Sequence, residues 1–176
     1  MIEKIIIAGA GGQGIMLMGK VLASACLKEN KHVTWMPSYG AEVRGGTAHC
    51  LVVISDEEIG SPYIKEADTL IIMNEPSWRR FKSRVKEKGL LVVNSSLVKK
   101  NTEKNMGVLQ HPFTDIALKL GNIKVANMVA LGCYIAKKKI INVSSILEVI
   151  KEMAPQDKKN LIAINKQALE EGLKLK

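Results

Sequence analysis

Aromatic residues, cysteine and long apolar runs are all scarce in this 176-residue sequence. Only 4% of the residues are aromatic although 47% are hydrophobic, so the chain can bury an aliphatic core but has few rings on which nucleic-acid bases could stack. The longest apolar stretch, residues 123–136, contains Lys124 and Asn127 and is shorter than the about 20 residues that a membrane helix needs. We therefore expect neither a nucleic-acid nor a membrane partner. Because the first residues show no secretory signal pattern, we expect a cytoplasmic protein.

The three cysteines are far apart along the chain. Cys26, Cys50 and Cys133 form no C-x-x-C pair or other spacing that is typical of metal ligands. We therefore expect no metal or iron–sulfur site made by this chain alone. Each thiol is expected to lie buried as a small apolar side chain in a reducing compartment.

Positive charge predominates over negative charge. Lysine and arginine number 26 against 17 aspartates and glutamates, which gives a formal net charge of +9. This charge favours an anionic partner, such as an acidic protein or a phosphorylated cofactor. The basic runs at residues 79–88 and 137–139 are interpreted as solvated faces.

The order of apolar runs and helix-forming segments predicts an α/β fold. We expect a single Rossmann-like domain over residues 1–176, with a mostly parallel sheet flanked by helices and a helical C-terminal third. A strand at residues 2–8, a helix at 15–28 and a strand at 32–36 form a βαβ-like opening, for which a right-handed crossover is expected. Further strands are predicted at 48–54, 69–73, 90–93 and 108–110.

The remaining segments are predicted to be helical. A basic amphipathic helix at residues 77–88 would direct Phe81 and Val85 inward and end at Gly89. The other expected helices cover residues 114–120, 125–138, 144–153 and 157–172.

The first candidate site is the glycine-rich turn Gly9-Ala10-Gly11-Gly12-Gln13-Gly14. A turn between a strand and a helix collects backbone N–H groups at the helix N-terminus, which is a natural anion site. The second strand ends in Thr34-Trp35-Met36-Pro37, without the acidic residue that holds a ribose, which argues against NAD. In the pattern Gly14-x-x-x-x-Gly19-Lys20, Val21 replaces the magnesium-binding Ser or Thr of a P-loop, which argues against ATP. Two interpretations remain open: the glycines allow close packing, or the turn binds phosphate or a partner.

The second candidate site follows the second strand, at the edge where open α/β sheets place their ligands. Its arginine can hold a phosphate or carboxylate through two parallel hydrogen bonds, or pair with the nearby glutamate. Its glycines allow the backbone to approach a ligand closely. The candidate residues are Ser38, Tyr39, Gly40, Glu42, Arg44, Gly45, Gly46 and Thr47.

The third candidate is Asn127, which interrupts an apolar helix within the segment Asn127-Met128-Val129-Ala130-Leu131-Gly132. A buried asparagine needs hydrogen-bond partners, so we expect it to cap or tether a neighbouring loop, with ligand contact as the alternative. His49, in a predicted strand, is interpreted as a structural residue.

These three segments, in this order and at this chain length, resemble the gamma subunit of the 2-oxoacid:ferredoxin oxidoreductase family over nearly the whole chain. The segment Tyr39-Gly40-Ala41-Glu42-Val43-Arg44-Gly45-Gly46 carries the resemblance most specifically. A free-standing chain of this size is most similar to the 2-oxoglutarate-type enzymes, while pyruvate, branched-chain (ketoisovalerate) and indolepyruvate enzymes use similar domains.

The resemblance implies a subunit of an enzyme that oxidatively decarboxylates a 2-oxoacid, expected to be 2-oxoglutarate, to its acyl-CoA and reduces ferredoxin. It implies alpha, beta and ferredoxin-like delta partner subunits and an acidic ferredoxin as electron acceptor. The chain has no Gly-Asp-Gly thiamine motif and no cysteines at cluster spacing. Thiamine diphosphate, magnesium and iron–sulfur clusters are therefore expected on the partner subunits. We expect the isolated chain to be inactive, with no catalytic residue, and to contribute assembly, shaping of the site and contact with coenzyme A. The alternative is a stand-alone phosphate- or nucleotide-binding module.

Overall fold

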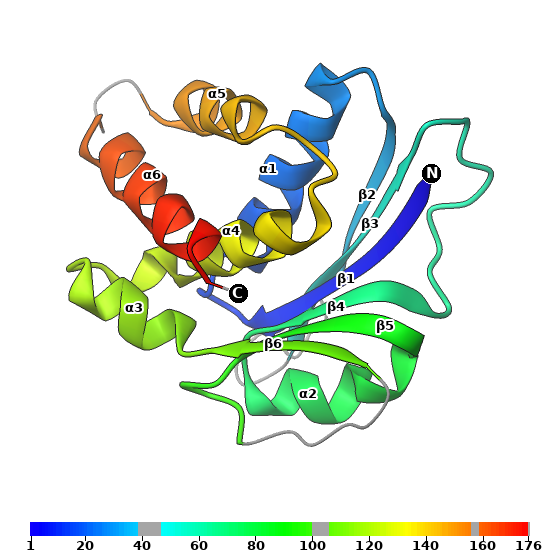
Figure 1. Ribbon diagram of the computed structural model, residues 1–176, viewed down its shortest axis with the longest axis horizontal. Helices are drawn as coiled ribbons and strands as arrows, with labels where there is room; N and C mark the ends of the chain where they lie inside the picture. The colour runs from blue at the N-terminus through cyan, green and yellow to red at the C-terminus, as the bar shows by residue number, and fades with distance from the viewer. Residues whose placement is uncertain (39–46, 100–105, 156–158, 176) are drawn as a thin grey trace.

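A six-stranded sheet forms the centre of the molecule, for which the computed structural model describes residues 1–38, 47–99, 106–155 and 159–175. The strands lie in the order β2-β3-β1-β4-β5-β6 (Figure 1). Their bounds are β1 (Ile2–Ala10), β2 (His32–Ser38), β3 (Thr47–Ser55), β4 (Ala67–Ile72), β5 (Val85–Asn94) and β6 (Gly107–His111). The predicted fold class, a mostly parallel α/β sheet with C-terminal helices, is confirmed.

The sheet is mixed because β3 runs against its neighbours. The pairs β1–β4, β4–β5 and β5–β6 are parallel, whereas β3 is antiparallel to both β1 and β2. The expected βαβ-like opening is therefore wrong in one respect: β3 lies between β1 and β2. The physical reason is burial, since residues 50–54 of β3 are apolar and buried on both faces, as a central strand requires. Strand β2 is only partly buried along its length, which suits an edge.

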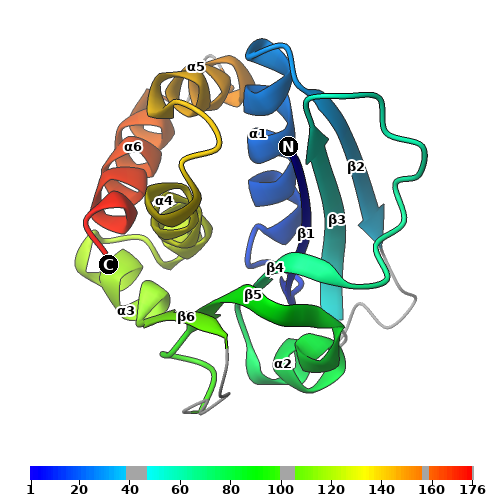
Figure 2. The same ribbon diagram turned by 45° about the vertical axis from the view of Figure 1, so that its right-hand side comes forward.

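Alternate residues of each central strand pack into two separate cores. In β1, Ile5 and Ile7 face one core while Ile6 and Ala8 face the other. The larger core lies under α1 (Ile15–Lys28), α3 (Phe113–Lys119), α4 (Ala126–Lys138), α5 (Val143–Met153) and α6 (Lys159–Leu173). The smaller core lies under α2 (Glu75–Phe81), which Figures 1 and 2 show apart from the other helices.

The predicted helix at residues 77–88 is shorter than expected and begins earlier. Asn74 caps α2 by accepting a hydrogen bond from the Ser77 N–H at 3.1 Å. The helix ends at Phe81, a 3₁₀ turn η1 covers Lys82–Arg84, and β5 begins at Val85. Phe81 and Val85 are both buried, but Val85 is buried as a strand residue paired with Ala67 of β4. Pairing with β4 thus overrides the local helical pattern.

The sequence suggested that Gly89 ends a helix. In the structure this residue lies inside β5 instead. A Cβ atom there would come within 2.9 Å of the Lys86 carbonyl oxygen and 3.2 Å of the Asp68 carbonyl oxygen. The backbone of β5 approaches β4 closely at this point, where the β4–β5 register also shifts.

The helices after β6 lie within two residues of their predicted bounds. Helix α4 is preceded by a 3₁₀ turn η2 (Ile123–Val125). Helices α4 and α6 cross with their backbones in contact at two glycines. A Cβ on Gly132 would lie 3.0 Å from the Gly172 Cα, and a Cβ on Gly172 would lie 2.9 Å from the Cys133 nitrogen.

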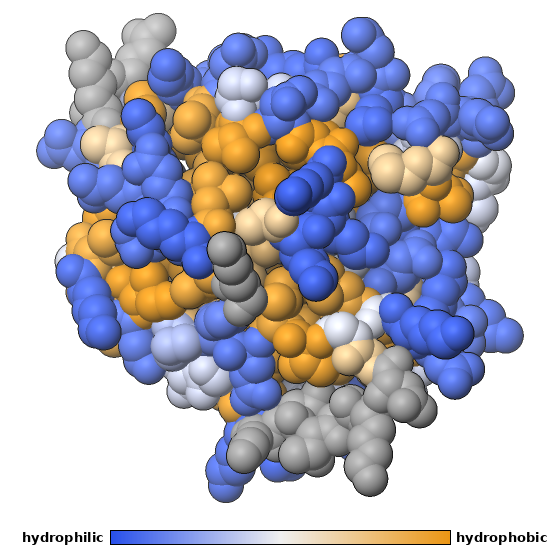
Figure 3. Space-filling model, viewed as in Figure 1, coloured by the Kyte–Doolittle hydropathy of each residue, from blue (hydrophilic) through white to orange (hydrophobic). Residues whose placement is uncertain are grey.

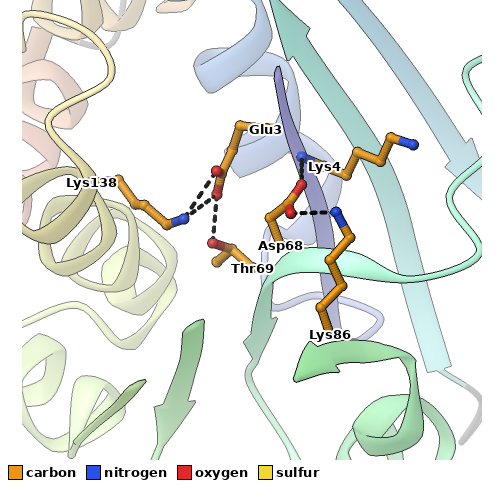
Figure 4. Close-up of polar contacts among 6 residues, drawn as sticks. All are labelled: Glu3, Lys4, Asp68, Thr69, Lys86 and Lys138. Atoms are coloured by element: carbon orange, nitrogen blue, oxygen red, sulfur yellow. Dashed lines mark hydrogen bonds and ion pairs between the residues drawn. The ribbon is translucent and has the colours of Figure 1, made fainter. Parts of the chain in front are cut away.

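Two carboxylates buried or half-buried at the amino ends of β1 and β4 hold these strands to their neighbours (Figure 4). Glu3, only 6% exposed, accepts a hydrogen bond from the Thr69 hydroxyl at 2.6 Å and pairs with the Lys138 ammonium at 2.9 Å. Asp68 accepts from the Lys4 N–H at 2.9 Å and pairs with Lys86 at 2.6 Å. The sequence analysis interpreted the basic runs that contain Lys86 and Lys138 as solvated faces. For these two residues that interpretation is wrong, because each forms an ion pair with a buried or half-buried carboxylate.

Apolar side chains also reach the surface. Figure 3 shows hydrophobic patches between hydrophilic residues on the face viewed in Figure 1. The exposed large apolar residues include Leu17 and Leu27 of α1 and Leu161 of α6. Within the described ranges, every helix is too short or too polar to cross a membrane.

Candidate functional site

The carboxyl ends of β1, β2, β4 and β5 meet the amino end of β3 at one edge of the sheet. Ala10 of the glycine turn pairs with Thr47 of β3, and Ser38 of β2 pairs with His49. The topology therefore brings the glycine turn together with both described ends of the second predicted segment. This is the edge at which open α/β sheets bind their ligands.

The side chain of Gln13 closes the glycine turn. Its Oε1 accepts from the Ala10 N–H at 2.7 Å, and its Nε2 donates to the Met73 carbonyl oxygen at 3.2 Å. The Gln13 N–H also donates to the Ala10 carbonyl oxygen at 3.2 Å. One amide thus joins the end of β1 to the residue that follows β4. The sequence marked Gln13 as a site residue but did not predict this role.

Two glycines of the turn are needed for close packing. A Cβ on Gly9 would lie 2.6 Å from both the Gln13 Oε1 and the Ile15 Cδ1. Gly14 has a φ of +68°, in the left-handed region that favours glycine, and a Cβ there would collide with the Asn127 amide. Gly11 and Gly12, in contrast, are exposed. The packing interpretation therefore accounts for Gly9 and Gly14, and Gly11 and Gly12 present backbone to solvent.

Asn127 holds the turn from α4. Its side chain is 1% exposed, its Nδ2 donates to the Gly14 carbonyl oxygen at 3.1 Å, and its Oδ1 accepts from the Met128 N–H at 2.9 Å. The expected tether between this asparagine and a neighbouring loop is present, and the loop is the glycine turn. The first and third predicted segments therefore form one structural unit.

A second buried asparagine was missed by sequence reasoning. Asn94, at the end of β5, donates from Nδ2 to the Met73 carbonyl oxygen at 3.2 Å and to the Thr114 hydroxyl at 2.8 Å. Its Oδ1 accepts from the Thr114 N–H at 3.3 Å, so it also fixes the start of α3. A polar residue directly after the apolar run Leu-Leu-Val-Val was the available signal, because the carboxyl ends of parallel strands share this edge.

Only part of the second predicted segment can be placed. Tyr39, Gly40, Glu42, Arg44, Gly45 and Gly46 lie outside the described residues, and their roles stay predictions. Thr47 lies at the start of β3, where its hydroxyl accepts from Arg80 Nη1 at 2.6 Å. His49 is half-buried in β3, with its ring 4.8 Å from that of Phe81. Burial, and then the charges of Arg80 and Arg84, lower the pKa of His49.

The three thiols are buried, as predicted. Burial raises the pKa of Cys26 and Cys50 to about 12 and that of Cys133 to about 11, so all three are protonated at neutral pH. Within the described ranges, no three His, Cys, Asp or Glu side chains gather closely enough to hold a metal ion. This donor set does not fit an iron–sulfur cluster.

Within the described residues, several polar groups at this edge bond to one another. Hydrogen bonds connect Gln13, Asn94 and Thr114 through the Met73 carbonyl, and Asn127 bonds separately to the Gly14 carbonyl. Lys20 lies well inside α1 rather than at its start, where a P-loop lysine would lie. These hydrogen bonds can fix the backbone that forms the surface at this edge. A small pocket lined by Gly12, Thr114 and Ile123 lies beside the turn.

The model of the family described as pyruvate ferredoxin/flavodoxin oxidoreductase matches residues 4–175. The chain belongs to this family. A 2-oxoglutarate synthase subunit, KorC, of Methanocaldococcus jannaschii is 36% identical over 172 residues, which cover 94% of this chain and 92% of that protein. The family resemblance carried by the sequence motifs is thereby confirmed.

Other relatives carry the same domain within longer chains. The ketoisovalerate oxidoreductase subunit VorA of Methanothermobacter thermautotrophicus is 38% identical over 172 residues, 96% of this chain. This chain spans only 35% of that protein's length, and 28% of the VorA of Methanothermobacter marburgensis.

Solved structures of two relatives share the fold. The crystal structure of a keto/oxoacid ferredoxin oxidoreductase gamma subunit from Geobacter sulfurreducens matches with a TM-score of 0.83 and 28% identity, covering 97% of this chain and 96% of that one. The 2-oxoglutarate:ferredoxin oxidoreductase from Magnetococcus marinus matches with a TM-score of 0.88 at 23% identity, over 97% of this chain and 30% of the other. At that identity the second likeness establishes the fold alone.

Proposed function

We propose that this chain is the gamma subunit of a 2-oxoacid:ferredoxin oxidoreductase, and that residues 1–176 form its gamma-type domain. The observation that carries the proposal is the match to KorC along almost the full length of both chains. The site supports it too, because the polar groups of the edge stabilise one another and leave a rigid surface. Such a surface suits a subunit that shapes a site shared with other chains better than one that performs the reaction.

The proposed substrate of the assembled enzyme is 2-oxoglutarate. Two relatives of matching length support this choice: the KorC subunits of Methanocaldococcus jannaschii and Methanothermobacter marburgensis, of which the chain covers 92% and 100%. The ketoisovalerate and pyruvate relatives make those 2-oxoacids the alternatives to be tested.

Thiamine diphosphate, magnesium and the iron–sulfur clusters are assigned to alpha, beta and ferredoxin-like delta partner subunits, with an acidic ferredoxin as acceptor. The thiols of this chain are buried and protonated, which supports that assignment. Contact with coenzyme A is proposed at the exposed Gly11 and Gly12 and at the segment containing Arg44. Here the net charge of +9 favours an anionic cofactor, and Gln13 and Asn127 would hold the turn in position.

Affinity purification of the tagged chain from native cells tests the subunit assignment. We expect thiamine-binding and cluster-binding chains to co-purify, and the complex to reduce ferredoxin with 2-oxoglutarate and coenzyme A. The same complex is assayed with pyruvate and 3-methyl-2-oxobutanoate to identify the substrate. Recovery of the tagged chain alone, or turnover by the pure chain, would contradict the proposal and favour the stand-alone binding module.

A further inference from the structure

Two arginines and a histidine surround one phenylalanine on the α2 side of the sheet. The guanidinium carbons of Arg80 and Arg84 lie 5.4 Å and 5.8 Å from the centre of the Phe81 ring, and the His49 ring lies 4.8 Å from it. The groups come from β3, α2 and η1, so the fold and not the local sequence brings them together. The four residues, with Thr47, are called the Phe81 cluster below.

The positive charges of the Phe81 cluster are not balanced by carboxylates within the described ranges. Neither Arg80 nor Arg84 has an ion-pair partner there, whereas the adjacent Arg79 pairs with Glu75 at 3.2 Å. Arg84 donates hydrogen bonds from Nη2 and Nε to the carbonyl oxygens of Ile64 and Lys65. These carbonyls are neutral, so the charge of the guanidinium stays unbalanced.

Arg80 is the most exposed charged residue of the Phe81 cluster. Within the described residues it makes one hydrogen bond, to the Thr47 hydroxyl at 2.6 Å, so most of its five N–H groups remain available there. The bond also fixes the guanidinium beside β3, which reduces the side-chain entropy that ligand binding would cost. Burial, and the charges of Arg80 and Arg84, lower the pKa of His49, which is the response expected where positive charge is already concentrated.

We propose that the Phe81 cluster is an anion site that binds a phosphate group through Arg80 and Thr47, with Arg84 adding to the positive field. A phosphate suits it because it offers several acceptor oxygens and up to two negative charges to a planar guanidinium fork. The site lies on the α2 side of the sheet, on the opposite face from α1 (Figure 2), and its Thr47 pairs with Ala10 of the glycine turn. The inference does not depend on the proposed function.

Calorimetric titration of the 176-residue chain with inorganic phosphate, at constant ionic strength, tests the site. We expect saturable binding, weakened at least 10-fold by Arg80→Gln and partly retained by Arg80→Lys, which keeps the charge but loses the fork. Arg79→Gln is the matched control: it removes a neighbouring arginine that is already paired with Glu75, and it should bind phosphate like the unaltered chain.

Nuclear magnetic resonance of the His49 ring locates the binding. Phosphate should shift the His49 signals. The signals of His32 should stay unchanged, because His32 begins β2 and the other end of that strand, Ser38, is the one that pairs with His49. Titration with coenzyme A and with dephospho-coenzyme A then separates the sources. Stronger binding of coenzyme A identifies its 3′-phosphate as the ligand, and equal binding of the two identifies their shared diphosphate. Binding of inorganic phosphate with neither compound bound points to a free phosphate.

Three outcomes would overturn the inference: no saturable phosphate binding, equal weakening by Arg79→Gln and Arg80→Gln, or binding that appears only after Glu42→Gln. The last result would mean that the cluster serves a carboxylate of the chain itself. Failure here is distinguishable from failure of the proposed function. A chain that assembles with its partners but ignores phosphate refutes only the anion site, and one that binds phosphate but co-purifies with nothing refutes only the subunit assignment.

Discussion

Replacing Gln13 by alanine should destabilise the chain by removing the amide that closes the glycine turn. Two hydrogen bonds are lost, but their consequences differ. The Met73 carbonyl oxygen keeps its bond from Asn94, whereas the part-buried Ala10 N–H loses its acceptor. An unsatisfied buried donor costs about 1–3 kcal/mol. For a chain of this size, about 1 kcal/mol shifts the melting temperature by about 2–4 °C, so we expect a decrease of about 2–12 °C.

Gln13→Glu separates the two ends of the amide. The carboxyl group can still accept from Ala10, but when ionised it turns a negative oxygen toward the Met73 carbonyl. The folded state therefore disfavours the charged form and raises the pKa of this carboxyl above its unfolded value. A group with a raised folded pKa contributes stability below the unfolded pKa, about 4.3 for glutamate, and that contribution is lost as the pH rises through the folded pKa. The melting-temperature difference between Gln13→Glu and the unaltered chain should thus widen from pH 4 to pH 7.

Thermal unfolding followed by circular dichroism across this pH range checks both variants. Gln167→Ala is the control, because Gln167 is exposed on α6 and its loss should change the stability by less than about 0.5 kcal/mol. If Gln13→Ala melts together with Gln167→Ala, or if the deficit of Gln13→Glu is the same at pH 4 and pH 7, the amide does not stabilise the turn as argued.

Four further predictions follow from the same structure. Gly172→Ala should cost about 1–3 kcal/mol or more in denaturant unfolding, because its Cβ meets backbone atoms of α4; a cost like that of an exposed alanine substitution would refute the contact. Lys138→Met should lower the stability, since it leaves the Glu3 carboxylate buried without its cation; a loss no larger than that of an exposed lysine substitution would show that the pair does not stabilise the fold. The pKa of His49 is lowered in the folded state, so its neutral form stabilises the fold above about pH 6.5 and this contribution is lost on acidification. The fall in melting temperature from pH 7 to pH 5 should therefore be smaller for His49→Gln than for the unaltered chain, and an equal fall would show that His49 does not contribute. Thiol labelling of the native chain should be slow at all three cysteines and fast only after unfolding; rapid native labelling of Cys50 would contradict its burial.

Features decided by short-range sequence were predicted well. The apolar runs that became β1 and β4, and the helix-forming residues of α1, indicate their own type of structure because the signal is contained within a few neighbouring residues. Strand direction is different, since it depends on partners far along the chain. The central place of β3 and the conversion of Val85 from helix to strand both follow from pairing with strands whose positions the local sequence does not contain.

The candidate site shows the same division. Glycine spacing and an asparagine in an apolar helix singled out Gln13, Gly14 and Asn127, but the bond between Gly14 and Asn127 joins residues 113 positions apart. Asn94 and the Phe81 cluster were not found, because their groups come from separate elements and no single segment carries a motif. The role of Arg44 stays a prediction: Arg44→Ala should leave the melting temperature nearly unchanged and weaken assembly or the use of coenzyme A.

The backbone contact between Gly132 and Gly172 couples the last described helix, α6, to the glycine turn near the start of the chain. Helix α4 carries this contact at its middle and Asn127 at its start, so the packing of α6, the last helix described, and the position of the glycine turn both depend on α4. Loosening the packing of α6 on α4 should therefore also loosen the glycine turn, although no strand joins the two segments. Amide hydrogen exchange at the first turn of α1 would report the docking of α6, and the chain would open there as one cooperative unit rather than by fraying from its C-terminal helix.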